Sequence, residues 1–317
     1  MKLRFRTRFE VNPLPPFDFR LTVRKPAGWS LFTSGEVYED ETLWTGIRSG
    51  ERPLGLKIKS SGTLERPRVL VAVYSGRAVS KAESERIRET LSVCLGAEQD
   101  LTGFYGFAKR DTILKHVVES LYGMHDTQAA SLFNSVILAI CLQMARLKRS
   151  NQMMEAIDRE YGEAIEFDGK RVLLQPTAAQ VAKLDPVDMA KACKLGYRAK
   201  YIVASAKMIE SGFPEMRQIM KMPPERAKEE LVKLPGIGDY AADIINPHAG
   251  FPIDAWSVDV FGLLFFGKQP ENRRDAIEEV KEEGIRRWGA WSWMAFFYVA
   301  QDLRNLSEKL GIQLRLE

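Results

Sequence analysis

The chain reads LPGIGDYAAD over residues 234–243, and this stretch decides which fold we expect. The preceding residues 225–233, ERAKEELVK, favour a helix, and a second helix is expected to begin near Asp239. Gly236 and Gly238 lie between the two helices, where glycine permits backbone angles and close approaches that a side chain would block. The N–H groups at the start of the second helix favour a phosphate ligand. The stretch therefore predicts either a plain helical connection or a tight turn that binds phosphate.

Two aspartates follow in the segment FPIDAWSVDV at residues 251–260. They differ in their separation from Tyr240, which is 14 residues for Asp254 (254 − 240) and 19 residues for Asp259 (259 − 240). The apolar run FGLLFF at residues 261–266 predicts a helix directly after Asp259. Asp259 can also serve as the N-cap of this helix, because Asp is favoured at that position.

These two stretches together resemble the helix-hairpin-helix superfamily of DNA glycosylases, in which a loop and a catalytic aspartate follow the second helix. The spacing in that family is closer to the longer of the two separations. The string Val258-Asp259-Val260 also looks like the family's Val-Asp-x. The resemblance therefore implies that Asp259 is the catalytic carboxylate, and Asp254 remains the rival.

Other strings extend the resemblance over much of the chain. LGYRAKY at residues 195–201 is similar to a Gly-Tyr-Arg-Ala string of 8-oxoguanine glycosylases, and WGAW at residues 288–291 looks like the last helix of that group. DLTGFY at residues 100–105 resembles the inducible 3-methyladenine glycosylases of bacteria. Such relatives often carry an antiparallel α+β domain ahead of the helical part, so the resemblance implies the same order here.

A glycosylase breaks the bond between a base and its sugar through a transition state with positive charge on the sugar. A carboxylate beside the sugar stabilises that charge and can orient a water molecule, which is the role implied for Asp259. Tyr240 stands where lyase-type relatives carry a Schiff-base lysine, and a phenol cannot form an imine. The resemblance thus implies a monofunctional enzyme that excises a damaged base from double-stranded DNA, with an alkylated purine favoured. The alternatives are a bifunctional 8-oxoguanine glycosylase/AP lyase and a DNA-binding module without catalysis.

The resemblance also assigns residues to the DNA and to the flipped base. The residues implied in DNA binding are Gly236, Gly238, Gln143, Met144, Tyr197 and Arg198, with Met144 as the wedge that fills the gap. The aromatic residues that can stack on an electron-poor base are Tyr105, Trp256, Trp291 and Tyr298. Core packing is the alternative for each of these aromatics. The backbone carbonyls that would bind a monovalent cation, as in relatives, belong to Val232, Leu234 and Ile237. No cofactor is expected to be required.

The sequence predicts two domains, an antiparallel α+β domain over residues 1–99 and a helical helix-hairpin-helix domain over residues 100–317. Alternating or short apolar runs predict strands over residues 3–9, 17–23, 43–48, 54–58 and 69–74. A helix is predicted over residues 81–95. The longest helix is predicted over residues 131–148, which are largely apolar.

The composition is that of an ordinary globular protein, with 45% hydrophobic and 28% charged residues. The net charge of +4 permits nucleic acid as a partner without requiring it. No apolar run is long enough to span a membrane, and the first residues lack a signal-peptide core. We therefore expect an intracellular protein, cytoplasmic or nuclear, with no membrane partner and a monomer as the default.

Overall fold

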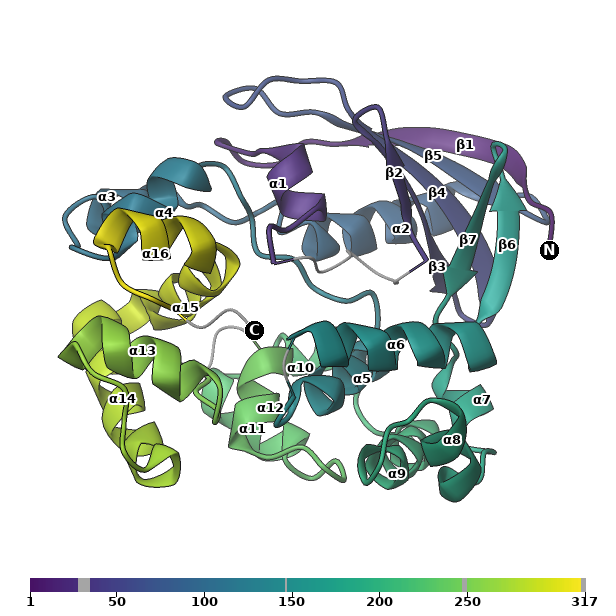
Figure 1. Ribbon diagram of the computed structural model, residues 1–317. Coiled ribbons are helices and arrows are strands. Elements are labelled where there is room, and N and C mark those ends of the chain that lie inside the picture. Colours follow the sequence, from purple (N-terminus) through teal and green to yellow (C-terminus); the bar gives the residue numbers. More distant parts are fainter. Residues whose placement is uncertain (28–34, 146, 247–249, 315–317) are drawn as a thin grey trace.

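A five-stranded antiparallel sheet lies at one end of the molecule, and helices form most of the remainder (Figure 1). The computed structural model describes residues 1–27, 35–145, 147–246 and 250–314. The strands lie in the order β1-β5-β4-β3-β2 and comprise β1 (Arg4–Val11), β2 (Val37–Glu39), β3 (Thr42–Ser49), β4 (Arg52–Ser60) and β5 (Val69–Ser75). This arrangement confirms the predicted α+β class, with the antiparallel sheet first and the helices after it.

One face of the sheet is buried against helix α2 (Lys81–Cys94). Leu54 and Ile58 of β4 have no exposed surface. Ile87 and Leu91 of α2 lie in the same apolar cluster, one helical turn apart. Apolar side chains that recur every second residue in the strand therefore pack against apolar side chains that recur every fourth residue in the helix.

The segment after β1 corrects one sequence prediction. Residues 17–23 were expected to form a strand, but the structure has the short helix α1 (Phe19–Val23) there. The cause is Asp18, whose carboxylate accepts a hydrogen bond from the Leu21 N–H at 2.8 Å. Asp at this position caps a helix. This contact favours the helix, although the alternating polarity of residues 17–23 is typical of a strand.

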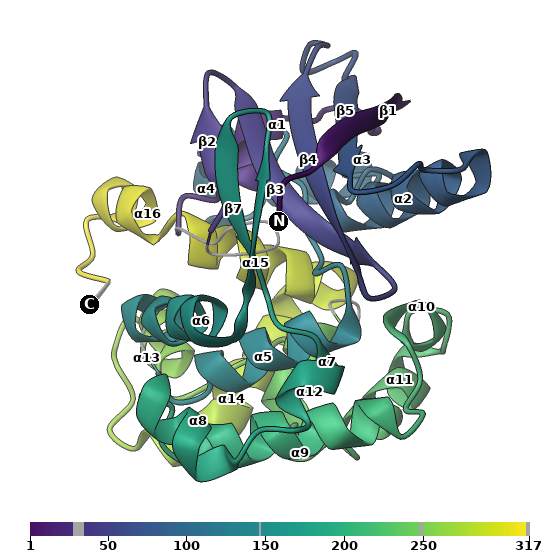
Figure 2. The ribbon, with the colours of Figure 1, turned by 90° about the vertical axis from the view of Figure 1, so that its right-hand side faces the viewer.

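The opposite face of the sheet is covered by a hairpin that the sequence patterns did not predict. Strands β6 (Glu163–Phe167) and β7 (Lys170–Leu174) come from the helical half of the chain and pair with each other. They lie beside the sheet in Figure 2. Trp44 of β3 packs with this hairpin, whereas its neighbour Leu43 packs with the α2 side. Successive strand residues point to opposite faces, so the hairpin and α2 cover different faces.

The remaining helices surround two apolar clusters. The first cluster is built by α5 (Leu132–Leu142), α6 (Leu147–Tyr161), α7 (Ala178–Val181), α8 (Pro186–Ala192), α9 (Arg198–Glu210), α10 (Met216–Ile219), α11 (Pro224–Leu231) and α12 (Asp239–Ile245). The second is built by α3 (Thr102–Ala108), α4 (Leu114–Ser120), α13 (Ser257–Phe266), α14 (Arg273–Trp288), the 3-10 turn η1 (Gly289–Trp291), α15 (Ser292–Gln301) and α16 (Leu303–Leu310). Within the described ranges, no helix combines the length and the apolar composition needed to cross a bilayer.

Candidate active site

The predicted hairpin is present as α11, α12 and the turn between them. Gly236 has a φ of +82°, and a Cβ added to it would lie 2.6 Å from the Cβ of Tyr201 in α9. Only glycine fits at this point. Ser205 of α9 donates a hydrogen bond to the Pro235 carbonyl at 2.8 Å. Gly238 is different, because a Cβ there would meet nothing within 4 Å. The turn is therefore packed against α9 at Gly236 and open at Gly238.

An ion pair joins the two helices of the hairpin. The Lys228 ammonium of α11 lies 3.0 Å from the carboxylate of Asp243 and 3.3 Å from that of Asp239, both in α12. Asp243 is buried, and this burial raises the pKa of its carboxyl group although Lys228 opposes the shift. The pairing joins α11 to the first two turns of α12.

The predicted helix over residues 131–148 is interrupted at the site. Helix α5 ends at Leu142, and Gln143 leaves the helical conformation, with a ψ of 125°. The Gln143 side chain donates a hydrogen bond to the Gly236 carbonyl at 2.6 Å, and the Gln143 carbonyl accepts one from the Arg198 guanidinium. These two contacts hold Gln143 between the hairpin turn and α9. Met144 follows with a φ of +48° and a side chain that is 71% exposed. A large apolar side chain held outward on strained backbone suits a functional position.

Tyr197 and Arg198 lie beside this interruption. The Arg198 guanidinium is 4.7 Å from the centre of the Tyr197 ring, and Tyr197 is 47% exposed. Arg198 in turn contacts Gln143, and Gln143 contacts Gly236. The structure therefore brings four residues predicted to bind DNA into one continuous set of contacts, with Met144 next in the chain to Gln143.

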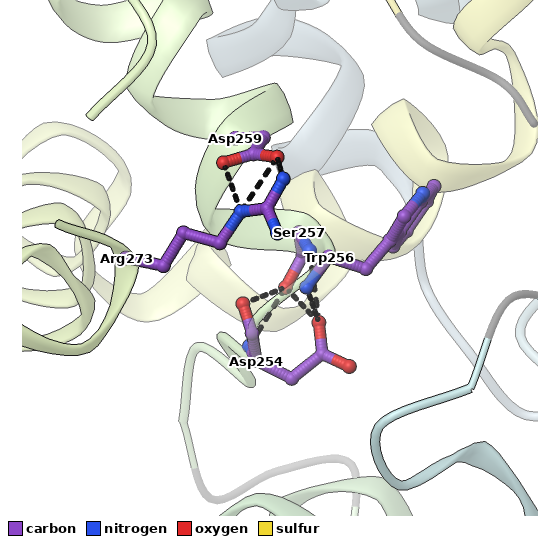
Figure 3. A network of polar contacts seen from close by, with 5 residues as sticks. All are labelled: Asp254, Trp256, Ser257, Asp259 and Arg273. Carbon is purple, nitrogen blue, oxygen red and sulfur yellow. Dashed lines mark hydrogen bonds and ion pairs between the residues drawn. The ribbon is translucent and has the colours of Figure 1, made fainter. Parts of the chain in front are cut away.

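Asp254 organises the start of α13 (Figure 3). One of its carboxylate oxygens accepts hydrogen bonds from the N–H groups of Trp256 and Ser257, at 3.1 and 2.8 Å. The same oxygen accepts from the Ser257 hydroxyl at 2.8 Å, and that hydroxyl accepts from the Asp254 N–H. Asp254 therefore satisfies the first N–H groups of the helix, which is the work of a capping residue.

Asp259 lies in the first turn of α13, where the helix dipole favours a negative charge. Its carboxylate is paired with Arg273, the first residue of α14 (Figure 3). The Arg273 Nε lies 2.9 and 3.0 Å from the two carboxylate oxygens, and Nη2 lies 2.5 Å from Oδ2. This hydrogen bonding raises the pKa of Arg273. The carboxylate thus faces away from the helix, toward an exposed cation.

A pocket of about 230 Å³ opens at this carboxylate. Its lining residues are Met144, Ala145, Ala255, Trp256, Asp259, Val260, Leu263, Gln269, Arg273 and Leu314. Met144 and Ala145 follow α5 of the first helical cluster, whereas the others belong to or flank elements of the second. The pocket therefore lies where the two helical clusters meet. Three residues predicted separately, the wedge Met144, the stacking Trp256 and the carboxylate Asp259, line the same space.

Tyr240 is half-buried in the first turn of α12. Burial raises the pKa of its phenol, and the negative charge of Asp254 adds to that shift. Tyr240 therefore stays neutral and lies near Asp254. Tyr240 is not among the residues that line the pocket.

The other predicted base-pocket aromatics lie elsewhere. Tyr105 and Tyr298 are buried in the second helical cluster, and their hydroxyls are hydrogen-bonded to each other at 2.8 Å. The Tyr105 hydroxyl also accepts from the Gly123 N–H, and Tyr298 donates to the Met124 carbonyl. Burial raises the pKa of both phenols. These contacts are those of core residues, so the structure does not bring Tyr105 or Tyr298 to the pocket.

Trp291 lies in the turn η1, with its ring 5.7 Å from that of Phe104. It does not line the pocket beside Asp259 either. Of the four aromatics predicted to stack on a base, the structure brings Trp256 to that pocket.

The three residues expected to offer carbonyls to a cation surround the hairpin turn. The Leu234 carbonyl accepts a hydrogen bond from the Ile237 N–H at 3.0 Å. The side chains of Leu234 and Ile237 are buried, while Val232 is exposed. Among the described residues, no group of three or more His, Cys, Asp and Glu side chains is arranged to hold a metal ion.

Sequence reasoning missed Arg273, Gln269 and Leu314 as pocket residues. Arg273 stands next to Arg274 in a charged helix, and nothing in the sequence separates the two. The distinguishing feature is spatial, because the start of α14 is placed against the first turn of α13. The sequence signal for Arg273 is its place at the start of the helix that follows α13, where Arg274 is basic as well.

Several known proteins are similar to this chain, although no protein-family model matches it. A DNA-3-methyladenine glycosylase of Bacillus subtilis is 27% identical over 226 residues, which cover 70% of this chain and 74% of that protein. A probable N-glycosylase/DNA lyase of Methanothermobacter thermautotrophicus is 25% identical over 294 residues, which cover 86% of this chain and 89% of that protein. The solved structure of a 3-methyladenine DNA-glycosylase from Archaeoglobus fulgidus superimposes with a TM-score of 0.75 at 20% identity, covering 93% of this chain and 98% of that one. With its hairpin and the aspartate after it, the chain is a relative of the DNA glycosylases of the helix-hairpin-helix superfamily.

Proposed function

We propose that the protein is a monofunctional DNA glycosylase that hydrolyses the N-glycosidic bond of a damaged base, with alkylated purines as its substrate class. One observation carries this proposal. Asp259 lines a pocket together with Trp256 and the exposed Met144. The relatives at 27% and 25% identity, which are named as glycosylases, support the same reaction class.

The electrostatic role of Asp259 follows from its place. A flipped nucleotide in the pocket would bring its sugar next to this carboxylate, which would stabilise positive charge as the glycosidic bond breaks. The carboxylate would also orient the attacking water. Trp256 offers an aromatic face to the base, and an electron-poor alkylated purine stacks well on such a face.

Met144 would fill the space that the flipped base leaves in the duplex. Its exposure and its position at the pocket edge support this role. Tyr197 and Arg198, in the same set of contacts, would meet the strand nearby. The open backbone at Gly238 would let a phosphate approach the N-terminus of α12.

A monovalent cation at the hairpin forms part of the proposal. Carbonyl oxygens of Val232, Leu234 and Ile237 would hold it, because hard cations prefer oxygen ligands. When bound, it would add positive charge near the DNA backbone. No chemical step depends on it.

The absence of a lyase step rests on Tyr240 and on the pocket lining. A phenol forms no imine, and the described residues that line the pocket include no lysine. A bifunctional 8-oxoguanine enzyme is the second candidate, because one relative is named as a probable N-glycosylase/DNA lyase.

Excision from duplex oligonucleotides with single lesions tests the proposal. The panel contains uracil, hypoxanthine, 8-oxoguanine and an N3-alkylated adenine, and each product is analysed with and without alkali. We expect strand breaks on the alkylated purine that appear only after alkali. Breaks without alkali would show a lyase step and favour the second candidate. Salt-dependent binding without excision of any base would favour a DNA-binding module.

A further inference from the structure

The ion pair at Asp259 opposes the role proposed for this carboxylate. Nε of Arg273 donates to both carboxylate oxygens, and Nη2 donates again to one of them. A guanidinium is always charged, so it neutralises Asp259 as long as the pair persists. A neutralised carboxylate stabilises a neighbouring sugar cation less. At least some of the hydrogen bonds between Arg273 and Asp259 therefore have to break before Asp259 can fully stabilise the sugar cation.

The two partners differ in their freedom to move. The Asp259 side chain is 15% exposed and fixed on the first turn of α13, whereas the Arg273 side chain is 57% exposed. The backbone at Arg273 is held, because Asn272 caps α14 by accepting from the Arg274 N–H at 3.1 Å. The guanidinium can thus exchange partners while its helix stays in place. Partly exposed ion pairs are weak enough for such an exchange.

We propose that Arg273 is an electrostatic latch, which pairs with Asp259 in the free protein and transfers to a backbone phosphate when DNA is seated at the pocket. This proposal rests on the proposed function of the site. A phosphate beside the flipped nucleotide offers oxygens in the geometry that a guanidinium binds bidentately. Arg273 is then a positioning residue that unmasks Asp259 only in the presence of DNA.

A binding cycle tests the exchange without any chemistry. Asp259→Asn, Arg273→Gln and the double variant are titrated with a duplex that carries a neutral tetrahydrofuran site and no excisable base. Removing a negative charge near DNA tightens binding by itself. The effect of Asp259→Asn on DNA affinity is therefore compared between the wild type and the Arg273→Gln variant. We expect Asp259→Asn to tighten binding at least about threefold more when Arg273 is present. Arg273→Gln is expected to weaken binding and to reduce the salt slope by about one.

If Arg273 stays paired with Asp259 when DNA binds, Asp259→Asn tightens DNA binding equally with and without Arg273. The salt slope of Arg273→Gln then matches that of the wild type. Either result would overturn the latch. Arg274→Gln is the matched control, since Arg274 is the exposed neighbour on the same helix.

Single-turnover excision separates a latch from a clamp that orients the carboxylate. If Arg273 is a latch, Arg273→Gln raises the half-saturating DNA concentration and leaves the maximal rate unchanged. A clamp predicts a maximal rate at least about tenfold lower with an unchanged half-saturating concentration, which would overturn the proposal. If the wild type excises no base, the proposed function fails, while the binding cycle still decides whether Arg273 exchanges partners.

Discussion

The turn that precedes α13 and the first turn of α13 contain the same residue type in opposite surroundings. Asp254 accepts hydrogen bonds from two backbone N–H groups and from the Ser257 hydroxyl. Asp259 accepts from the side chain of Arg273 and lines a pocket. The first aspartate is bound to the backbone of its own segment, and the second faces a space that a ligand can enter.

This difference indicates a structural role for Asp254 and a chemical role for Asp259. Asp254 fixes where the helix begins, and the helix then determines where Asp259 points. A change at Asp254 should therefore act first on stability. A change at Asp259 should act first on chemistry. Substitutions of the two aspartates, compared with changes at their neighbours, distinguish these roles.

The largest effect is expected for Asp259→Asn. The amide keeps the shape of the side chain but removes the charge that would stabilise the sugar cation, so the excision rate should fall on the order of 10²–10³-fold. Single-turnover excision of an alkylated purine measures this loss, and thermal unfolding checks that the fold is intact. A variant that keeps the wild-type rate would remove Asp259 from the mechanism.

The next effect is expected for Met144→Ala. Truncation removes the group proposed to fill the gap in the duplex, so kcat/KM should fall about tenfold for a lesion in a normal pair. The loss should shrink when the lesion is mispaired, because less energy is then needed to flip the base. Val187→Ala is the control, since Val187 is also an exposed apolar residue. An equal loss for paired and mispaired lesions would contradict the wedge role.

Asp254→Ala should mainly lower stability. Loss of the capping hydrogen bonds should reduce the free energy of unfolding by about 1 kcal/mol. Denaturant unfolding measures this change, and excision below the unfolding transition should continue. A rate loss as large as that of Asp259→Asn, in a folded protein, would make Asp254 the catalytic carboxylate instead.

The smallest effect is expected for Tyr240→Phe. Burial and Asp254 keep this phenol neutral, so its hydroxyl contributes no charge to the reaction. The excision rate should change less than about threefold, and strand breaks should still require alkali. A large loss of activity would show that the Tyr240 hydroxyl takes part in the reaction.

Local sequence signals predicted the elements that position the site. The two glycines after a charged, helix-favouring segment predicted the hairpin, and the apolar run after Asp259 predicted α13; both are present. The strand patterns predicted β1, β3, β4 and β5 as well. In these segments, the residues that determine the structure are neighbours in the sequence.

Contacts between distant residues account for what was missed. The apolar run over residues 131–148 gives no sign of a break, because the break depends on Gly236 and Arg198. Tyr105 and Tyr298 look like stacking residues until their mutual hydrogen bond is seen. Arg273 becomes distinct from Arg274 only when α14 is placed beside α13. Each of these is a tertiary contact that no local pattern encodes.

The affinity for a cationic sugar analogue reports whether Asp259 stabilises positive charge on the sugar. A duplex with a pyrrolidine cation at the lesion site is compared with a duplex that carries neutral tetrahydrofuran, for the wild type, Asp254→Asn and Asp259→Asn. If Asp259 stabilises the sugar cation, the wild type and Asp254→Asn should both prefer the cationic duplex by about tenfold or more. Asp259→Asn should lose that preference. A preference that survives in Asp259→Asn, or disappears in Asp254→Asn, would show that a group other than Asp259 stabilises the cation.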